Sequence, residues 1–183
     1  DLENWQQLGI SPEFAEKQNL VIDAFRRMNI LISCTCTPYL IGNLPLYGEH
    51  LAWSESSAVT FANSVLGART NREGGPSALA AAFIGKTPNY GLHLDENRVP
   101  DVLVEVNAEL TKLSDWGALG YAIGKKAENK ISYITGIKSA ELDELKSFCA
   151  SVVTYGAKPL FYLQGVTPGA EQQPQLKEKV VIA

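Results

Sequence analysis

The second half of the chain alternates between short apolar runs and longer amphipathic stretches. Apolar runs at 101–106, 131–135 and 158–163 are typical of buried strands. Between them, the stretches 115–127 and 139–153 carry apolar residues at helical spacing. Strands that alternate with helices favour a mostly parallel sheet. The sequence therefore predicts an α/β fold, with helices on both faces of that sheet.

The first hundred residues predict helices and loops in place of this alternation. A helix is expected after Ser11, which can cap it, and a short apolar strand is expected at 30–33. Two further helices are predicted at 54–66 and at 76–84, the second ended by Gly85. The first part of the chain is thus expected to be rich in helix and loop.

This change of pattern divides the chain into a helix-rich segment, 1–100, and an α/β segment, 101–183. The first carries the candidate site residues, and the second ends in an apolar run that is typical of an incomplete strand. A chain of 183 residues is long enough for one α/β domain, or for one domain and part of another. Because the chain also begins without Met, we expect it to be a piece of a larger catalytic region.

Charge and composition exclude several classes of function. The net charge is −4 and no basic stripe is present, which argues against a nucleic-acid partner. No apolar run approaches the ~20 residues that span a bilayer, and no signal segment opens the chain, so we expect a cytoplasmic protein without a membrane partner. Three cysteines, an odd number, favour a reducing compartment over a disulfide framework.

The polar hinge between the two predicted helices is the strongest candidate for a binding site. Arg69 and Arg72 flank Asn71 there, and Gly75 follows just before the next predicted helix. Guanidinium groups stay charged and hold carboxylate or phosphate in a two-pronged fork, while glycine lets backbone N–H groups approach a ligand. We predict that the hinge binds an anionic small molecule. The alternative is an internal ion pair between an arginine and a nearby glutamate.

The helix before the hinge has an unusually polar side, made by Ser56, Ser57, Asn63 and Ser64. These residues are expected to line a cavity beside the hinge, with solvent exposure as the alternative. Glu55, at the start of the helix, is a candidate general base. It could equally cap the helix, and the sequence leaves both interpretations open.

Cysteine and histidine supply the remaining candidate chemistry. Cys34 and Cys36 stand two apart at the end of the predicted strand, where both side chains would share a face and could bind iron. The alternative is that they are small core residues, as is expected for Cys149. His50 could orient a metal-bound water or carry a proton, whereas a structural role is the alternative for both His50 and His93.

Several long strings of the sequence together resemble the catalytic region of the aconitase X family. The resemblance covers most of the chain and implies an aconitase-like fold, hydro-lyase activity and a complete polypeptide about twice this length. The strings are CTCTPYL (34–40), GEHLAWSESSAV (48–59), FANSVLGARTNREGGPSALAAAFIGKTP (61–88), YGLHLDENR (90–98) and SDWGALGYAIGK (114–125).

The resemblance also implies a cofactor, a partner and a mechanism. Members of the family hold iron, as an iron–sulfur cluster or a single ion, and Cys36 matches one of the ligand positions. The other ligands would lie beyond residue 183, and a small swivelling subunit or fused domain would close over the site. Iron-assisted loss of water from an anionic hydroxy acid would use Arg69 and Arg72 to neutralise the carboxylate. His50 would assist the departing hydroxyl.

Two substrates of the family remain alternatives, 5-phosphomevalonate of the mevalonate pathway and cis-3-hydroxy-L-proline. The strings WSESSAV and YGLHLDENR look nearer to the enzymes that act on 5-phosphomevalonate, which is therefore the expected substrate. A hypothesis of another class is a non-catalytic α/β binding module, which would carry no iron.

Overall fold

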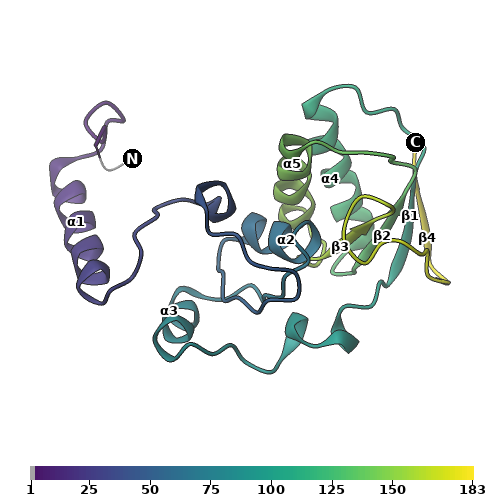
Figure 1. The fold of residues 1–183 in the computed structure, drawn as a ribbon. Helices are drawn as coiled ribbons and strands as arrows, with labels where there is room; N and C mark the ends of the chain where they lie inside the picture. The colour runs from purple at the N-terminus through teal and green to yellow at the C-terminus, as the bar shows by residue number, and fades with distance from the viewer. Residues whose placement is uncertain (1–2) are drawn as a thin grey trace.

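The computed structural model describes residues 3–183, and its second half is built on a four-stranded sheet (Figure 1). The strands lie in the order β3-β2-β1-β4, and every neighbouring pair is parallel. The predicted parallel sheet is confirmed, and the last strand lies at an edge, beside β1. The bounds are Val102–Val106 for β1, Ser132–Thr135 for β2, Phe161–Leu163 for β3 and Lys179–Ile182 for β4.

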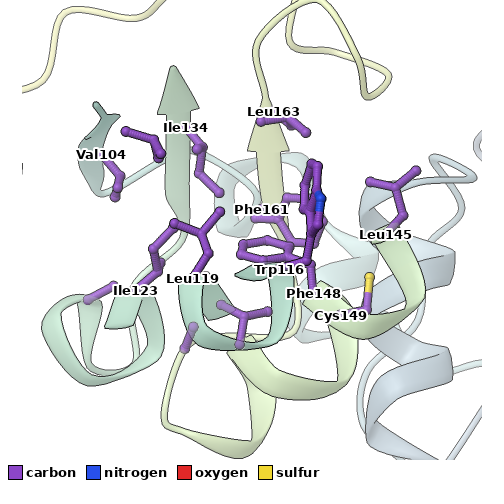
Figure 2. Packing of buried hydrophobic residues seen from close by; sticks show 14 of the residues in the cluster. Val104, Trp116, Leu119, Ile123, Ile134, Leu145, Phe148, Cys149, Phe161 and Leu163 are labelled. Atoms are coloured by element: carbon purple, nitrogen blue, oxygen red, sulfur yellow. The ribbon is translucent and has the colours of Figure 1, made fainter. Parts of the chain in front are cut away.

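Two helices, α4 (Leu113–Ala127) and α5 (Leu142–Thr154), pack on one face of the sheet and against each other. Phe148 of α5 meets Trp116 and Phe161 edge to face, with ring centroids 6.4 and 4.8 Å apart. Strand side chains alternate in direction, so one set from each strand enters this core. Figure 2 shows the two layers facing each other, with Val104, Ile134, Phe161 and Leu163 from the strands and Trp116, Leu119, Ile123, Leu145, Phe148 and Cys149 from the helices.

The opposite face of the sheet differs from the expectation of helices on both sides. In residues 3–183 this face is covered by the connection between β3 and β4, where Leu103, Tyr133 and Ala170 form a small apolar cluster. The Tyr133 hydroxyl donates to the Ala170 carbonyl over 2.9 Å. Because β3 and β4 lie at opposite edges, their Pro- and Gln-rich connection spans the whole sheet and takes the place of a helix.

The first half contains the predicted helices, with somewhat different bounds. Helix α1 runs over Pro12–Arg27, α2 over Ser56–Ser64 and α3 over Gly75–Ile84, which ends at the left-handed Gly85. Helix α2 lies against α5, whereas α1 stands away from the sheet (Figure 1). None of the helices in residues 3–183 has the length and apolar character needed to cross a membrane. The described part of the chain also contains three short 3₁₀ helices, η1 (Pro38–Ile41), η2 (Gly91–His93) and η3 (Asp95–Asn97).

The strand predicted at 30–33 is wrong. The segment has no partner strand, Leu31 is 82% exposed, and Cys34 takes a left-handed backbone with φ of 46°. An apolar run becomes a strand only where a neighbour supplies ladder hydrogen bonds, and none of the described strands lies beside it. The argument that Cys34 and Cys36 share one face of a strand therefore fails.

Candidate functional site

Two loop segments that flank α2, 48–53 and 67–73, run side by side and hold most of the predicted site residues. The Leu51 amide donates to the Arg69 carbonyl over 2.8 Å, and a parallel bridge pairs His50 with Arg69. We call these two segments the paired loops. Backbone pairing, rather than a regular sheet, therefore brings the loop around His50 against the arginine hinge.

Arg69 is held by a neighbouring turn. It donates to the His93 carbonyl over 2.9 Å and forms an ion pair with the carboxylate of Asp95. The hydrogen bond from Arg69 lowers the pKa of Asp95 below its usual range. Arg69 lines a cavity of about 350 Å³ together with Asn63 and Arg98. Arg69 thus forms an ion pair within the chain, but its partner is an exposed aspartate and not the glutamate of the alternative.

Arg72 points elsewhere. It is exposed, forms no ion pair with any of the described residues, and lines a separate cavity of about 410 Å³ with Asn71 and Lys158. Cys36 lines neither this cavity nor that of Arg69. Residues three apart on extended backbone project to opposite sides, which explains the separation of the two arginines. The structure thus does not bring the three side chains together in either cavity.

Two of the predicted binding residues of α2 make structural hydrogen bonds. Asn63 donates to the carbonyls of Thr70 and Pro159, each over 2.9 Å, and also accepts from the Thr70 amide over 3.0 Å. The Ser64 hydroxyl accepts from the Phe161 amide over 2.9 Å. Both side chains are buried. These hydrogen bonds hold α2 against the hinge and the edge of the sheet. Neither the predicted cavity-lining role nor the alternative of solvent exposure describes the two side chains fully.

Asn71 and Arg98 fasten the same region from the other side. Asn71 accepts from the Leu92 amide over 2.8 Å and donates to the Tyr90 carbonyl over 3.0 Å. Arg98, which sequence reasoning did not single out, donates to four oxygens, of Asn63, Leu92 and Ala68. Its only signal was its place at the end of the string YGLHLDENR. Burial lowers the pKa of Arg98 from its usual value.

Glu55 caps helix α2. Its carboxylate accepts from the Ala58 amide over 2.8 Å and also from the Ser57 hydroxyl. Ser56 and Ser57 are half-buried at this end of the helix, beside a small cavity of about 210 Å³ that Glu55 lines. The cap interpretation is confirmed, and a role as general base stays a prediction.

Gly75 opens helix α3 in an exposed position. Open space lies where a Cβ would stand, so no contact with the described residues requires glycine there. The approach of a ligand to its backbone stays a prediction.

His50 and His93, 43 residues apart, form a pair that sequence reasoning did not foresee. Their Nδ1 atoms lie 2.8 Å apart, and the two ring planes lie within 10° of parallel. His93 is buried and His50 is exposed. Burial, and next the neighbouring His50, lower the pKa of His93 below its usual value.

Two protein-family models match this chain. The model of the aconitase X first domain matches residues 1–96, and that of the aconitase X second domain matches residues 100–183. The chain belongs to the aconitase X family. It is also similar to the holo-form of aconitase X from Thermococcus kodakaraensis, with a TM-score of 0.88 and 48% identity over 94% of this chain and 45% of that one. The aconitase-like fold is therefore confirmed.

Curated aconitase X relatives carry two different names. The phosphomevalonate dehydratase large subunit of Methanosarcina mazei is 53% identical over the whole chain and 46% of that relative. The cis-3-hydroxy-L-proline dehydratase of Pseudomonas aeruginosa is 37% identical over 93% of the chain and 30% of that relative. The chain thus spans less than half the length of these relatives.

The cysteines of this aconitase X chain fit the implied iron only in part. Cys36 is exposed, just before η1, whose Tyr39 stacks on Phe61 of α2 at 3.9 Å and so anchors that loop. Cys34 is exposed too, whereas Cys149 is buried in the core and burial raises the pKa of its thiol. Residues 3–183 contain no group of three or more His, Cys, Asp or Glu placed to hold a metal. Cys36 could supply one thiolate, and further ligands would have to come from outside these residues.

Proposed function

We propose that this chain is part of the catalytic region of a hydro-lyase that removes water from 5-phosphomevalonate. The observation that carries the proposal is its 53% identity, over the whole chain, to a phosphomevalonate dehydratase large subunit. A cytoplasmic location belongs to the proposal, since the exposed thiols of Cys34 and Cys36 suit a reducing compartment. The names of the relatives favour assembly with a small subunit.

Loss of water from a hydroxy acid requires removal of a proton beside the carboxylate and departure of a hydroxyl group. Iron, when bound with Cys36 among its ligands, supplies a Lewis acid for the departing oxygen. Arg72 has no ion pair among the described residues, so its guanidinium is available to hold an anionic end of the substrate. Arg69 would have to exchange Asp95 for the substrate, and it is the weaker candidate for that reason.

The other candidates take supporting positions in this mechanism. His50 is exposed in the paired loops and would direct a ring N–H toward the departing hydroxyl. Ser56 and Ser57, in the first turn of α2, would contact polar groups of the substrate beside Glu55, which lines the neighbouring cavity. Asn63, Ser64 and Asn71 would act by holding the paired loops in place.

A second substrate and a second class of function have support of their own. Identity of 37% over 93% of the chain to a cis-3-hydroxy-L-proline dehydratase supports that compound as the alternative substrate. The incomplete set of metal ligands in residues 3–183 supports a non-catalytic binding module. One purified preparation is enough to test both alternatives.

The test is to purify the full-length protein without oxygen, with its small subunit, and to assay both compounds while measuring bound iron. We expect water to be lost from 5-phosphomevalonate, and bound iron to be found. Turnover of cis-3-hydroxy-L-proline alone would overturn the substrate, and an iron-free, inactive protein would favour the binding module. The 183-residue chain alone should be inactive, because residues 3–183 hold no complete set of metal ligands.

Arg72→Ala sharpens the assignment of the anion-binding group. Loss of a charge-assisted contact that tightens in the transition state should lower kcat/KM by an amount that corresponds to about 3 kcal/mol. Arg27→Ala, at the exposed end of α1, is the matched control and should leave kcat/KM unchanged. Unchanged turnover of a folded Arg72→Ala enzyme would remove Arg72 from the site.

A further inference from the structure

The two histidines impose a condition on where their protons lie. The Nδ1 atoms of His50 and His93 are 2.8 Å apart, which is hydrogen-bond distance. A neutral imidazole carries one N–H and one bare nitrogen. In the neutral pair, therefore, one Nδ1 must carry a proton and the other must accept it. In one arrangement His50 carries its proton on Nδ1, and in the other it carries it on Nε2.

Burial distinguishes the two arrangements. His93 is 3% exposed, and its Nε2 has no hydrogen-bond partner among the described residues. If His93 accepted at Nδ1, its own proton would sit on Nε2 as a buried N–H without an acceptor, which is rare and costly. If His93 donates from Nδ1, Nε2 carries only a lone pair. The second arrangement leaves no donor buried without a partner.

Neighbouring charges keep the His93 ring neutral, as the arrangement with a single N–H requires. Arg69 donates to the carbonyl of His93 itself, and Arg98 donates to the carbonyl of Leu92. Both cations lower the pKa of His93, whereas Glu73 acts in the opposite direction, and burial is the largest cause. The ring is therefore favoured in its neutral form, which carries a single N–H.

We propose that His93 is a positioning residue, which donates from Nδ1 to His50 and so holds the proton of His50 on Nε2. His50 lines a cavity of about 410 Å³ whose other polar side chains are Lys86 and Thr87, while alanines and Gly85 form the remaining wall. Each of these three polar side chains can donate a hydrogen bond. The cavity therefore suits an oxygen acceptor, and in the proposed dehydration, on which this role rests, that acceptor is the departing hydroxyl oxygen of the substrate.

The first test reads the protons directly and needs no turnover. Full-length protein labelled with ¹⁵N in the histidine rings is examined by long-range ¹H–¹⁵N NMR near pH 7.5. We expect His93 to show a protonated Nδ1 and a bare Nε2, and His50 to show the reverse. A protonated Nε2 on His93 would overturn the proposal. Because this result does not depend on activity, failure of the proposed function would be seen separately, in the assay of the unmodified enzyme.

The second test separates positioning from simple packing. His93→Asn places an amide N–H near the former Nδ1, whereas His93→Leu fills space without a donor. By analogy with partners that orient metal-bound histidines, we expect His93→Leu to lower kcat by about tenfold to a hundredfold with little change in KM, and His93→Asn to recover most of that loss. Ser132→Ala removes a second buried side-chain atom that has no partner among the described residues, and this control should not change kcat.

Equal kcat values for the Asn and Leu variants, with His50 keeping its proton on Nε2 in both, would overturn the proposal. If His93→Leu does not fold, the His93→Asn variant alone tests the proposal. Its His50 ring must show the same NMR signals as in the unmodified protein, and loss of those signals would overturn the proposal.

Discussion

The sheet layer and the paired loops are stabilised in different ways. Between the sheet and helices α4 and α5 lies a continuous apolar core, and parallel ladders satisfy the backbone. The paired loops are joined to each other by backbone hydrogen bonds, but side chains that bond to backbone, above all Asn63, Asn71 and Arg98, hold them against the neighbouring segments. Polar residues that resemble binding residues in the sequence are, in this second region, largely what holds the chain together.

This difference changes how candidate site residues should be ranked. In the sheet layer, one apolar side chain can replace another of similar volume at little cost. Each polar side chain of the paired loops, in contrast, has particular hydrogen-bond partners. A side chain that already satisfies its hydrogen bonds within the protein is a poorer candidate for substrate than one that does not. By this criterion Arg72 ranks above Asn63 and Ser64.

The largest effect is expected in the sheet layer, from Phe148→Ala. Phe148 is 1% exposed and meets two aromatic rings, so its loss leaves a cavity in the centre of the core. The free energy of unfolding should fall by about 3–5 kcal/mol, as urea titration followed by circular dichroism would measure. A loss below 1 kcal/mol would mean that this core is not the main source of stability.

Asn63→Ala tests whether the paired loops depend on hydrogen bonds. The substitution leaves the backbone groups of Thr70 and Pro159 without their side-chain partner and removes an acceptor from Arg98. We expect the free energy of unfolding to fall by about 2–3 kcal/mol in the same titration. Unchanged stability together with lost activity would instead place Asn63 at the substrate.

Two glycines of α4 provide a matched pair for the contact between α4 and α5. A Cβ at Gly120 would stand 2.6 Å from the Ser151 Cβ and 2.9 Å from the Val152 amide nitrogen, whereas one at Gly117 would meet Ser147 Oγ at 3.5 Å. Gly120→Ala should lower the free energy of unfolding by about 1–3 kcal/mol. Gly117→Ala should raise it by up to about 1 kcal/mol. Similar thermal midpoints for the two variants would contradict this packing.

Glu55 allows capping and catalysis to be separated. Glu55→Ala removes the acceptor of the Ala58 amide and should cost about 1 kcal/mol of stability. Glu55→Gln keeps an acceptor and should restore stability, as thermal unfolding would show. If Glu55→Gln is stable but its kcat falls in step with that of Glu55→Ala, the carboxylate has a role in the reaction beyond the cap.

The smallest effect is expected from pH. Burial and His50 lower the pKa of His93, with Arg98 and Arg69 acting the same way and Glu73 opposing them. As the pH falls below about 6.5, the unfolded chain therefore binds a proton that the folded protein resists, and stability declines until the folded pKa is passed. Urea titrations from pH 7.5 to 5 should show this decline, and His93→Asn should reduce it. A slope equal in both proteins would contradict the assignment.

Sequence patterns were sufficient for the sheet layer. Alternation of apolar runs and amphipathic stretches is a local property, and the burial of β1, β2 and β3 follows from it. The short run at 30–33 had the same apolar character without a neighbouring strand, so the prediction there was wrong. The division of the chain at residue 100, like the catalytic roles of the site residues, stays a prediction.

Residue types and local spacing were enough to establish an α/β fold, the main helices and a family resemblance that the comparisons confirm. Only the folded chain determined that Arg69 pairs with Asp95, that Arg72 turns to another cavity and that His93 meets His50. The reason is physical. The periodicity of buried positions depends on residues that are close in the sequence, whereas the partner of a polar side chain depends on which distant segment the fold brings within hydrogen-bond distance.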